Sequence, residues 1–363
     1  MKIGIDAKWF FEGPVSNRLV IRQLVQNLIA ENEGHELFIF LNQKHKNLPF
    51  DFLAPGVRLV YVWGGNNLIS NVFLLPFLGK KLGLDGILYQ NFGSFWGPKR
   101  WVYIHDVVFL SHPQFFTRTE RIYFSFMPFL LRFANKIITI SFSEKRRMES
   151  FGLQKNTAIE VVYHGRDEAF STLDHWNPEN WEGIKKKYSL PERYLLFVGR
   201  LNYRKNLGRL LEAVLQIENC PPLLVIGEKD WKTDPALDQL VREGERQKKI
   251  RLFGKISQED LPLLYAGAEV FCFVSLAEGF GLPVLEAMSS GIPVLTSKDT
   301  AMEEICGEAA IYCDPMDVQS IAEGLTFLIN QPEERIKLRA KGLMQKDKFD
   351  WNVTALKIFS ILK

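Results

Sequence analysis

Short apolar runs bounded by turn residues recur along the whole chain and alternate with segments of helical spacing. Most of these runs are apolar on both faces, as expected of strands buried on both sides of a sheet. Alternating strands and helices of this kind predict parallel sheets covered by helices on both faces. The expected strands are 2–7, 36–41, 57–62, 85–91, 100–106, 136–141 and 159–165, then 194–200, 222–228, 250–255, 270–275, 293–297 and 310–314.

The polar segment 166–190 interrupts this rhythm, which indicates a linker between two domains. The sequence therefore predicts an α/β chain of two doubly wound, Rossmann-like domains facing across a cleft. Their expected bounds are 1–170 and 171–345, and a C-terminal helix in 346–363 is expected to pack back towards the first domain. Ligands of such sheets bind beyond the carboxyl ends of the strands, so the residues of a binding site are expected there.

Charge and cysteine content exclude several classes of protein. The chain of 363 residues carries 45 basic and 42 acidic residues, a net charge of +3 that is too small to indicate nucleic-acid binding. The four cysteines show no zinc-like spacing, which favours reduced, buried thiols in a cytosolic protein. The chain starts with a strand pattern rather than a signal peptide, and it has no apolar stretch of the roughly 20 residues that span a bilayer. A cytoplasmic protein, soluble or attached peripherally to a membrane, is expected.

The segment 275–295 combines an expected strand, a glycine-containing loop and a helix start. Glu278 lies on the loop, Gly281 and Pro283 lead into the helix, and Glu286 is expected in its first turn. Exposed N–H groups at a helix start bind anions, and carboxylates accept hydrogen bonds from hydroxyls. Such a site suits a ligand with phosphates and two sets of hydroxyls. An isolated pair of glutamates at these positions would be a solvated loop residue and an ordinary helix-terminal acid.

A second loop, after the expected strand 194–200, carries two cations. Arg200 ends the strand, and Lys205 precedes a helix expected near Asn206. Two cations beside a helix start can neutralise the charge of a departing diphosphate. A solvated arginine and lysine are the plain alternative.

The first domain offers His105 and Asp106 after the expected strand 100–106. A histidine at a strand end can donate a hydrogen bond to a ligand, or it can be a core histidine satisfied by the backbone. His164 fits a structural or a cleft-lining role equally, and Lys255 follows another strand at a position where a solvated lysine is equally expected.

The string EGFGLPVLEAM, residues 278–288, resembles the E-x7-E signature of the family-4, GT-B glycosyltransferases (glycosyl transferases group 1). The resemblance implies that Glu286 holds the ribose hydroxyls of a nucleotide sugar and that Glu278 contacts the transferred sugar. It places the backbone of Phe280, Gly281 and Leu282 against the sugar and diphosphate.

Other segments carry the same resemblance. Gly199–Arg200, four residues and then Lys205–Asn206 match the family's diphosphate clamp, and the His105–Asp106 pair matches a family pair whose histidine points at the donor sugar. Lys255 lies where the family's base-binding loop lies.

The resemblance implies a retaining transfer of a sugar such as mannose, glucose or rhamnose from a nucleotide diphosphate sugar to an acceptor hydroxyl. The implied acceptor is a glycan or lipid-linked molecule in polysaccharide, lipopolysaccharide or glycolipid assembly. No metal ion and no cofactor besides the donor are expected, since the sequence has no D-x-D pair. The residues expected to take part in catalysis are His105, Glu278, Arg200 and Lys205.

Two features leave room for other interpretations. The loop after the first strand has Gly13, but Val15, Ser16 and Asn17 stand where the family usually has more glycine, which makes a catalytically silent nucleotide-sugar or partner-binding module the rival hypothesis. The segment 117–147 interleaves basic and aromatic residues, and 73–83 adds an apolar run. These segments fit either peripheral contact with anionic lipid or core helices with solvated charges.

Overall fold

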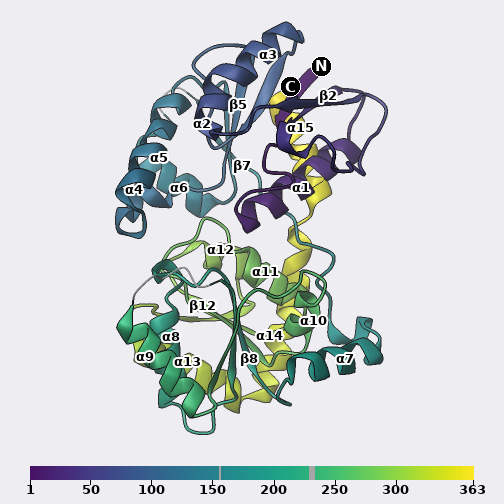
Figure 1. The fold of residues 1–363 in the computed structure, drawn as a ribbon. Helices are drawn as coiled ribbons and strands as arrows, with labels where there is room; N and C mark the ends of the chain where they lie inside the picture. The colour runs from purple at the N-terminus through teal and green to yellow at the C-terminus, as the bar shows by residue number, and fades with distance from the viewer. Residues whose placement is uncertain (155–156, 229–233) are drawn as a thin grey trace. The chain divides into compact units, whose positions relative to one another are not determined.

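The computed structural model describes residues 1–154, 157–228 and 234–363, and it divides into two compact units. The first unit comprises Met1–Gly165 and Phe349–Lys363, and the second comprises Arg166–Lys348 (Figure 1). The division after Gly165 lies five residues before the boundary expected from the sequence at 170. All four cysteines are free and buried. Within the described ranges, no helix is long and apolar enough to cross a membrane.

The first unit is built on a seven-stranded sheet in the order β3-β2-β1-β4-β5-β6-β7, with every pair parallel. Its strands are β1 (Lys2–Asp6), β2 (Glu36–Asn42), β3 (Val57–Val62), β4 (Gly86–Gln90), β5 (Lys99–Ile104), β6 (Lys136–Thr139) and β7 (Ile159–Val161). Its α-helices are α1 (Val15–Ala30), α2 (Asn67–Ile69), α3 (Leu75–Lys81), α4 (Val108–Ser111), α5 (Arg118–Leu131), α6 (Phe142–Ser150) and α15 (Trp351–Leu362). A π-helical turn, η2 (Ser70–Leu74), joins α2 to α3, and the short 3-10 helices are η1 (Gln43–His45) and η3 (Pro113–Phe115).

The second unit is built on a six-stranded parallel sheet in the order β10-β9-β8-β11-β12-β13. Its strands are β8 (Leu195–Val198), β9 (Leu223–Ile226), β10 (Ile250–Phe253), β11 (Val270–Phe273), β12 (Val294–Ser297) and β13 (Ala310–Cys313). Its α-helices are α7 (Pro178–Tyr188), α8 (Leu207–Gln216), α9 (Pro235–Arg246), α10 (Leu261–Ala266), α11 (Leu282–Ser289), α12 (Ala301–Cys306), α13 (Val318–Asn330) and α14 (Pro332–Gln345). The 3-10 helices are η4 (Leu173–His175), η5 (Tyr203–Lys205) and η6 (Lys346–Lys348).

Each expected strand is present in the structure, with one to four terminal residues of most runs belonging to the flanking loops instead. The expected linker 166–190 contains the 3-10 helix η4 and the helix α7. The segment 117–147 is not one helix: it contains α5, the strand β6 and the start of α6. The C-terminal helix α15 packs against α1, so both ends of the chain complete the first unit.

In each sheet, successive strands are added first towards one edge and then towards the other, so the strand order reverses at one position. In the first sheet this position lies between β1 and β4, and in the second it lies between β8 and β11. The loops beyond the carboxyl ends of two such neighbours diverge and leave room for a ligand. In the second unit, these are the loops that carry Arg200, Lys205 and Glu278.

Candidate functional site

An ion pair links the two loops beyond β8 and β11. The ammonium Nζ of Lys205, at the end of η5, lies 2.6 Å from Oε1 of Glu278. The same Nζ lies 4.4 Å from the centre of the Phe273 ring at the end of β11. Both charged side chains are largely buried, so their attraction is less screened than that of a surface pair. The structure thus brings together the lysine and the glutamate expected from the sequence.

Arg204 is a further cation at this site and was not singled out by the sequence. Its Nη1 lies 3.4 Å from Oε2 of Glu278 and donates to the carbonyl oxygen of Ala277 at 3.2 Å. Its own carbonyl oxygen accepts the N–H of Leu276 at 2.9 Å. Arg204 therefore fixes the loop after β11 through both its backbone and its side chain.

The two cations decide the charge of Glu278. Burial opposes ionisation of this carboxyl group, but Arg204 and Lys205 outweigh it and hold the pKa of Glu278 below its usual value. The side chain is therefore a carboxylate at neutral pH, already matched to positive charge.

Asn206 sets the path of the chain between Lys205 and α8. Its φ of +59° is left-handed, a conformation that asparagine tolerates better than most residues. Its Nδ2 donates to the carbonyl oxygens of Val274, at 3.0 Å, and Pro315, at 2.6 Å. These bonds tie the start of α8 to the end of β11.

The loop from Glu278 to Leu282 turns tightly into α11. Gly281 is the N-cap residue with a φ of +113°, and a Cβ atom there would lie 2.5 Å from the Sδ atom of Met302. Glycine is thus required both by the backbone and by the space. Phe280 is buried, and Gly291 adopts a left-handed conformation just after the C-cap of the helix, with a φ of +70°.

Glu286 lies in the second turn of α11, not in the first turn as expected, because the helix begins at Leu282. The hydroxyl of Tyr265 donates to its Oε2 at 2.8 Å. Burial raises the pKa of Glu286 to about 7, and Asp167 acts in the same direction. The two carboxyl groups of the site therefore differ in charge behaviour, since Glu278 stays ionised while Glu286 titrates near neutrality.

The strand ends beside this loop approach each other closely. The N–H of Gly199 donates to the carbonyl oxygen of Ile226, and the N–H of Gly227 donates to that of Gly254. Arg200 follows Gly199 and is exposed. Lys255 follows Gly254 and is also exposed, with its Nζ 3.9 Å from Oε1 of Glu228. Arg200 and Lys255 thus lie on the loops that follow the carboxyl ends of β8 and β10.

His105 follows β5 in the first unit and is buried. Its Nε2 lies 3.0 Å from Oε1 of Gln90, and its backbone N–H donates to Oδ1 of Asn91 at 3.0 Å. Burial lowers the pKa of His105 to about 4, so the ring is neutral at physiological pH. The carboxylate of Asp106 accepts the N–H of Val108 and so caps the following turn.

His164 packs beside His105, with ring centres 6.0 Å apart. Its Nδ1 lies 3.2 Å from the hydroxyl of Tyr103, and its ring packs on Trp351 of α15. These contacts give His164 a role in holding the C-terminal helix to the sheet.

A buried polar cluster beyond β1 also escaped the sequence interpretation. The Nζ of Lys8 lies 2.6 Å from Oδ1 of Asp6 and also donates to Asn71, whose Nδ2 donates to Oδ2 of Asp6 at 2.9 Å. Burial lowers the pKa of Lys8, although Asp6 acts in the opposite direction. Gly13 lies in the same loop with a φ of +147°, and a Cβ atom there would lie 3.0 Å from the Trp9 ring. The described part of the chain contains no group of three His, Cys, Asp or Glu side chains that could hold a metal ion.

Residues 181–343 match the family model described as Glycosyl transferases group 1. The matched segment is similar to members of that family and contains Lys205, Glu278 and Glu286. The chain is also 40% identical over 173 residues to the O-antigen chain mannosyltransferase B of Escherichia coli. That match covers 46% of this chain and 45% of the relative, so the chain spans about half the length of the relative.

Solved structures match nearly the whole chain and show its fold. The sucrose-phosphate synthase of Thermosynechococcus elongatus matches with a TM-score of 0.78 and 19% identity, covering 100% of this chain and 98% of that one. HepE of Anabaena, in complex with UDP-glucose, matches with a TM-score of 0.74 and 16% identity, covering 100% and 99%. The GT-B type of fold predicted from the sequence, with two Rossmann-like parallel sheets, is thereby confirmed.

Proposed function

We propose that the chain is a glycosyltransferase that moves a sugar from a nucleotide diphosphate sugar to an acceptor hydroxyl. The observation that carries the proposal is the ion pair between Lys205 and Glu278. It lies against the ring of Phe273, beyond β8 and β11, where the strand order of the second sheet reverses. A cation and a carboxylate held together there can serve the two halves of such a donor, its diphosphate and its sugar. Two comparisons support the same activity: the match of residues 181–343 to the group 1 glycosyltransferase model, and the similarity to a mannosyltransferase.

The proposed roles follow the residues of the second unit. Lys205 and Arg200 neutralise the diphosphate together with the backbone N–H groups of Phe280, Gly281 and Leu282 at the start of α11. Glu278 accepts hydrogen bonds from the sugar, and Glu286 accepts them from the ribose. Lys255 approaches the base.

His105 of the first unit contacts the donor sugar, and its low pKa makes the neutral imidazole the reacting form. Gly13 lies in the loop that opens towards donor and acceptor. Since the cations and the helix start stabilise the leaving group, the proposed transfer needs no metal ion. Retention of the anomeric configuration is the part of the proposal that the resemblance to the group 1 glycosyltransferases implies.

The donor sugar is proposed to be mannose or a related hexose, because the relative is named a mannosyltransferase. The acceptor is a glycan or lipid-linked molecule of polysaccharide, lipopolysaccharide or glycolipid assembly, reached from the cytoplasmic side with peripheral membrane contact. Nucleic acid is no partner, and the donor is the one small molecule that the reaction needs.

The test is a thermal-shift and calorimetric screen of nucleotide sugars against the purified chain. A ligand that binds only the folded state raises the melting temperature by mass action. Lys205→Ala removes a charge-assisted contact and leaves Glu278 facing the phosphates, so binding is expected to weaken by about 10- to 100-fold. The matched control is Lys186→Ala on α7, an exposed lysine whose loss should leave binding unchanged.

Several outcomes would contradict the proposal. Equal binding by Lys205→Ala and the wild-type protein would remove the diphosphate site from this loop. Loss of transfer on chelation, restored by magnesium or manganese, would overturn the metal-independent mechanism. Binding without transfer or donor hydrolysis would favour the catalytically silent module, the rival suggested by the loop around Gly13.

A further inference from the structure

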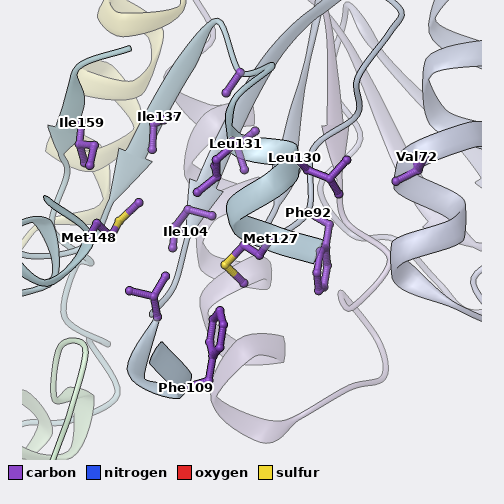
Figure 2. Packing of buried hydrophobic residues seen from close by; sticks show 13 residues of the cluster. Val72, Phe92, Ile104, Phe109, Met127, Leu130, Leu131, Ile137, Met148 and Ile159 are labelled. Carbon is purple, nitrogen blue, oxygen red and sulfur yellow. The ribbon is translucent and has the colours of Figure 1, made fainter. Parts of the chain in front are cut away.

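Helix α5 presents apolar side chains on two opposite faces. Met127, Leu130 and Leu131 point inward and belong to a buried cluster with residues of β5, β6 and α6 (Figure 2). On the other face, Ile122 is 65% exposed, Phe126 is 47% exposed and Phe129 is 50% exposed. The inward face already supplies the core, so folding of this unit does not explain the outward apolar residues.

These outward residues continue into a single surface with two other segments. Ring centres lie 5.5 Å apart for Phe129 and Phe133, 6.4 Å for Phe133 and Phe95, and 6.2 Å for Phe95 and Phe73. All four rings are exposed. Ile69 lies one helical turn before Phe73, and Phe77 lies one turn after it. We call this set the aromatic ridge: Ile69, Phe73, Phe77, Phe95, Ile122, Phe126, Phe129 and Phe133.

Hydrogen bonds fix the loop that joins the two halves of the aromatic ridge. The carbonyl oxygen of Val72 accepts bonds from Ser94 Oγ and Trp96 Nε1, both at 2.9 Å. Arg100 Nε donates to the carbonyl oxygen of Phe133 at 2.7 Å. These bonds hold Phe95 between η2, which carries Val72 and Phe73, and the segment just after α5, which carries Phe133, so the ridge is organised before anything binds to it.

The charges around the aromatic ridge are almost all positive. The segments 67–81 and 118–136 contain six basic residues and one acidic residue. The basic residues are all exposed: Lys80, Lys81, Arg118, Arg121, Arg132 and Lys136. The acidic residue, Glu120, is already engaged in the capping box of α5 with Thr117. This charge pattern complements an anionic partner.

An extended apolar surface of this kind is uncommon on a monomeric protein and marks an interaction site. Aromatic side chains bordered by lysine and arginine are typical of surfaces that lie at the boundary between lipid head groups and acyl chains. Basic residues strengthen such contacts with anionic lipid. We propose that the aromatic ridge and its basic border form a docking surface for an anionic lipid bilayer.

This inference deepens the proposed function and rests on it for one consequence. A glycosyltransferase docked in this way would take its acceptor from the bilayer surface, which assigns the acceptor to the lipid-linked class. The docking itself needs no catalytic activity, so the two proposals can fail separately.

The test is flotation of the full chain with two kinds of vesicle, one of phosphatidylcholine alone and one of phosphatidylcholine mixed with phosphatidylglycerol. The protein is expected to float with the mixed vesicles, to bind the neutral ones at least tenfold more weakly, and to be released from the mixed ones by high salt. Phe77→Ser with Phe129→Ser removes two exposed rings and should lower partitioning at least tenfold. Lys81→Glu with Arg121→Glu should also lower it at least tenfold, and only on the anionic vesicles.

The matched control is Ile336→Ser with Met344→Ser on α14, two similarly exposed apolar residues of the second unit. This variant should float like the wild-type protein, and Lys205→Ala should as well. Failure of the wild-type protein to float, or equal flotation of the ridge variant, would overturn the surface while leaving nucleotide-sugar binding untouched. Concentration-dependent dimerisation that Phe129→Ser abolishes, measured by light scattering, would assign the surface to a second copy of the chain instead.

Discussion

Glu278 and Glu286 lie eight residues apart, one on a loop and the other on the helix that follows it, yet their pKa values shift in opposite directions. Arg204 and Lys205 keep Glu278 ionised despite its burial. Glu286 has a tyrosine hydroxyl as its partner, and burial raises its pKa to about 7. The first carboxylate is therefore constant in charge, whereas the second changes charge within the physiological range.

The raised pKa of Glu286 predicts that donor binding depends on pH. Below pH 7 the group is mostly protonated, and above it the carboxylate accepts charge-assisted hydrogen bonds from the ribose hydroxyls. Affinity for a nucleotide sugar should therefore rise up to about tenfold from pH 6 to pH 8, as the ionised fraction rises. His105, whose pKa is about 4, stays neutral over this range. Calorimetric titrations at several pH values measure the slope.

Glu286→Gln is the control for this pH dependence, since it keeps the shape and removes the charge. Its affinity should be flat between pH 6 and pH 8, and an unchanged slope would assign the titration to another group. Stability gives an independent check. Between the ordinary carboxyl pKa of about 4.5 and pH 7, the folded protein holds a proton that the unfolded chain has lost, so wild-type stability falls as pH rises through this window. Glu286→Gln should show a smaller fall than the wild-type protein, with the part due to Glu144 remaining, because burial raises the pKa of Glu144 to about 8.

The sequence could predict Lys205 and Glu278 because each belongs to a motif with fixed spacing after a strand. It could not predict Arg204, because the direction of that side chain depends on the left-handed turn at Asn206 and on the loop after β11. The Asp6–Lys8–Asn71 cluster was missed for a related reason. Asn71 lies 65 positions after Asp6 and enters the cluster from the π-helical turn η2, which no local pattern reveals.

At the scale of elements, most strands were predictable because both of their faces are buried, which makes their sequences almost continuously apolar. Helices α7 and α14 could not be predicted from periodicity, because their largely exposed surfaces carry almost no apolar pattern. Only Ile184 is buried in α7, and only Leu338 and Gly342 are buried in α14. Each nonetheless begins with a proline at its first position, Pro178 after the capping Asn177 and Pro332 after Gln331. Those start signals, rather than periodicity, could have identified both helices.

Gly227 follows β9 and lies where the ends of β8 and β9 approach each other at the candidate site, so a substitution there can test whether this close approach is required. Its φ is +154°, and a Cβ atom there would lie 1.9 Å from the carbonyl oxygen of Gly199. Gly227→Ala must therefore push the end of β8 away, together with Arg200 and η5. We expect a loss of about 2–4 kcal/mol in the free energy of unfolding and weaker nucleotide-sugar binding. Denaturant unfolding and calorimetry measure the two effects.

Gly183→Ala on α7 is the matched control for Gly227→Ala, because its Cβ would meet nothing within 4 Å. Alanine favours a helix over glycine, so this variant should be stabilised by about 0.5–1 kcal/mol and should bind the donor normally. Wild-type stability and binding in Gly227→Ala would show that the close approach of β8 and β9 is not required.

At the scale of the whole molecule, the chain crosses between its two units twice, after Gly165 and after Lys348. The final segment completes the first unit through specific contacts. Thr354 Oγ1 donates to the carbonyl oxygen of Tyr163 at 2.7 Å, and a Cβ atom on Gly165 would lie 2.3 Å from the backbone nitrogen of Trp351. Polar composition could indicate a linker near 166–190, but these contacts between distant residues set the division after Gly165.

This arrangement predicts that a change in the last helix destabilises the first unit and spares the second. Ile358 of α15 is fully buried, so Ile358→Ala should cost about 2–4 kcal/mol through lost burial and the cavity left behind. Calorimetric unfolding with and without a nucleoside diphosphate distinguishes the units, because Lys205, Glu278 and Glu286 all belong to the second and the ligand should raise its transition. Ile358→Ala should lower only the other transition, and Leu356→Ala, an exposed position on the same helix, should lower neither. If Ile358→Ala lowered the ligand-sensitive transition equally, the two units would unfold as one cooperative block, and the division after Gly165 would have no thermodynamic meaning.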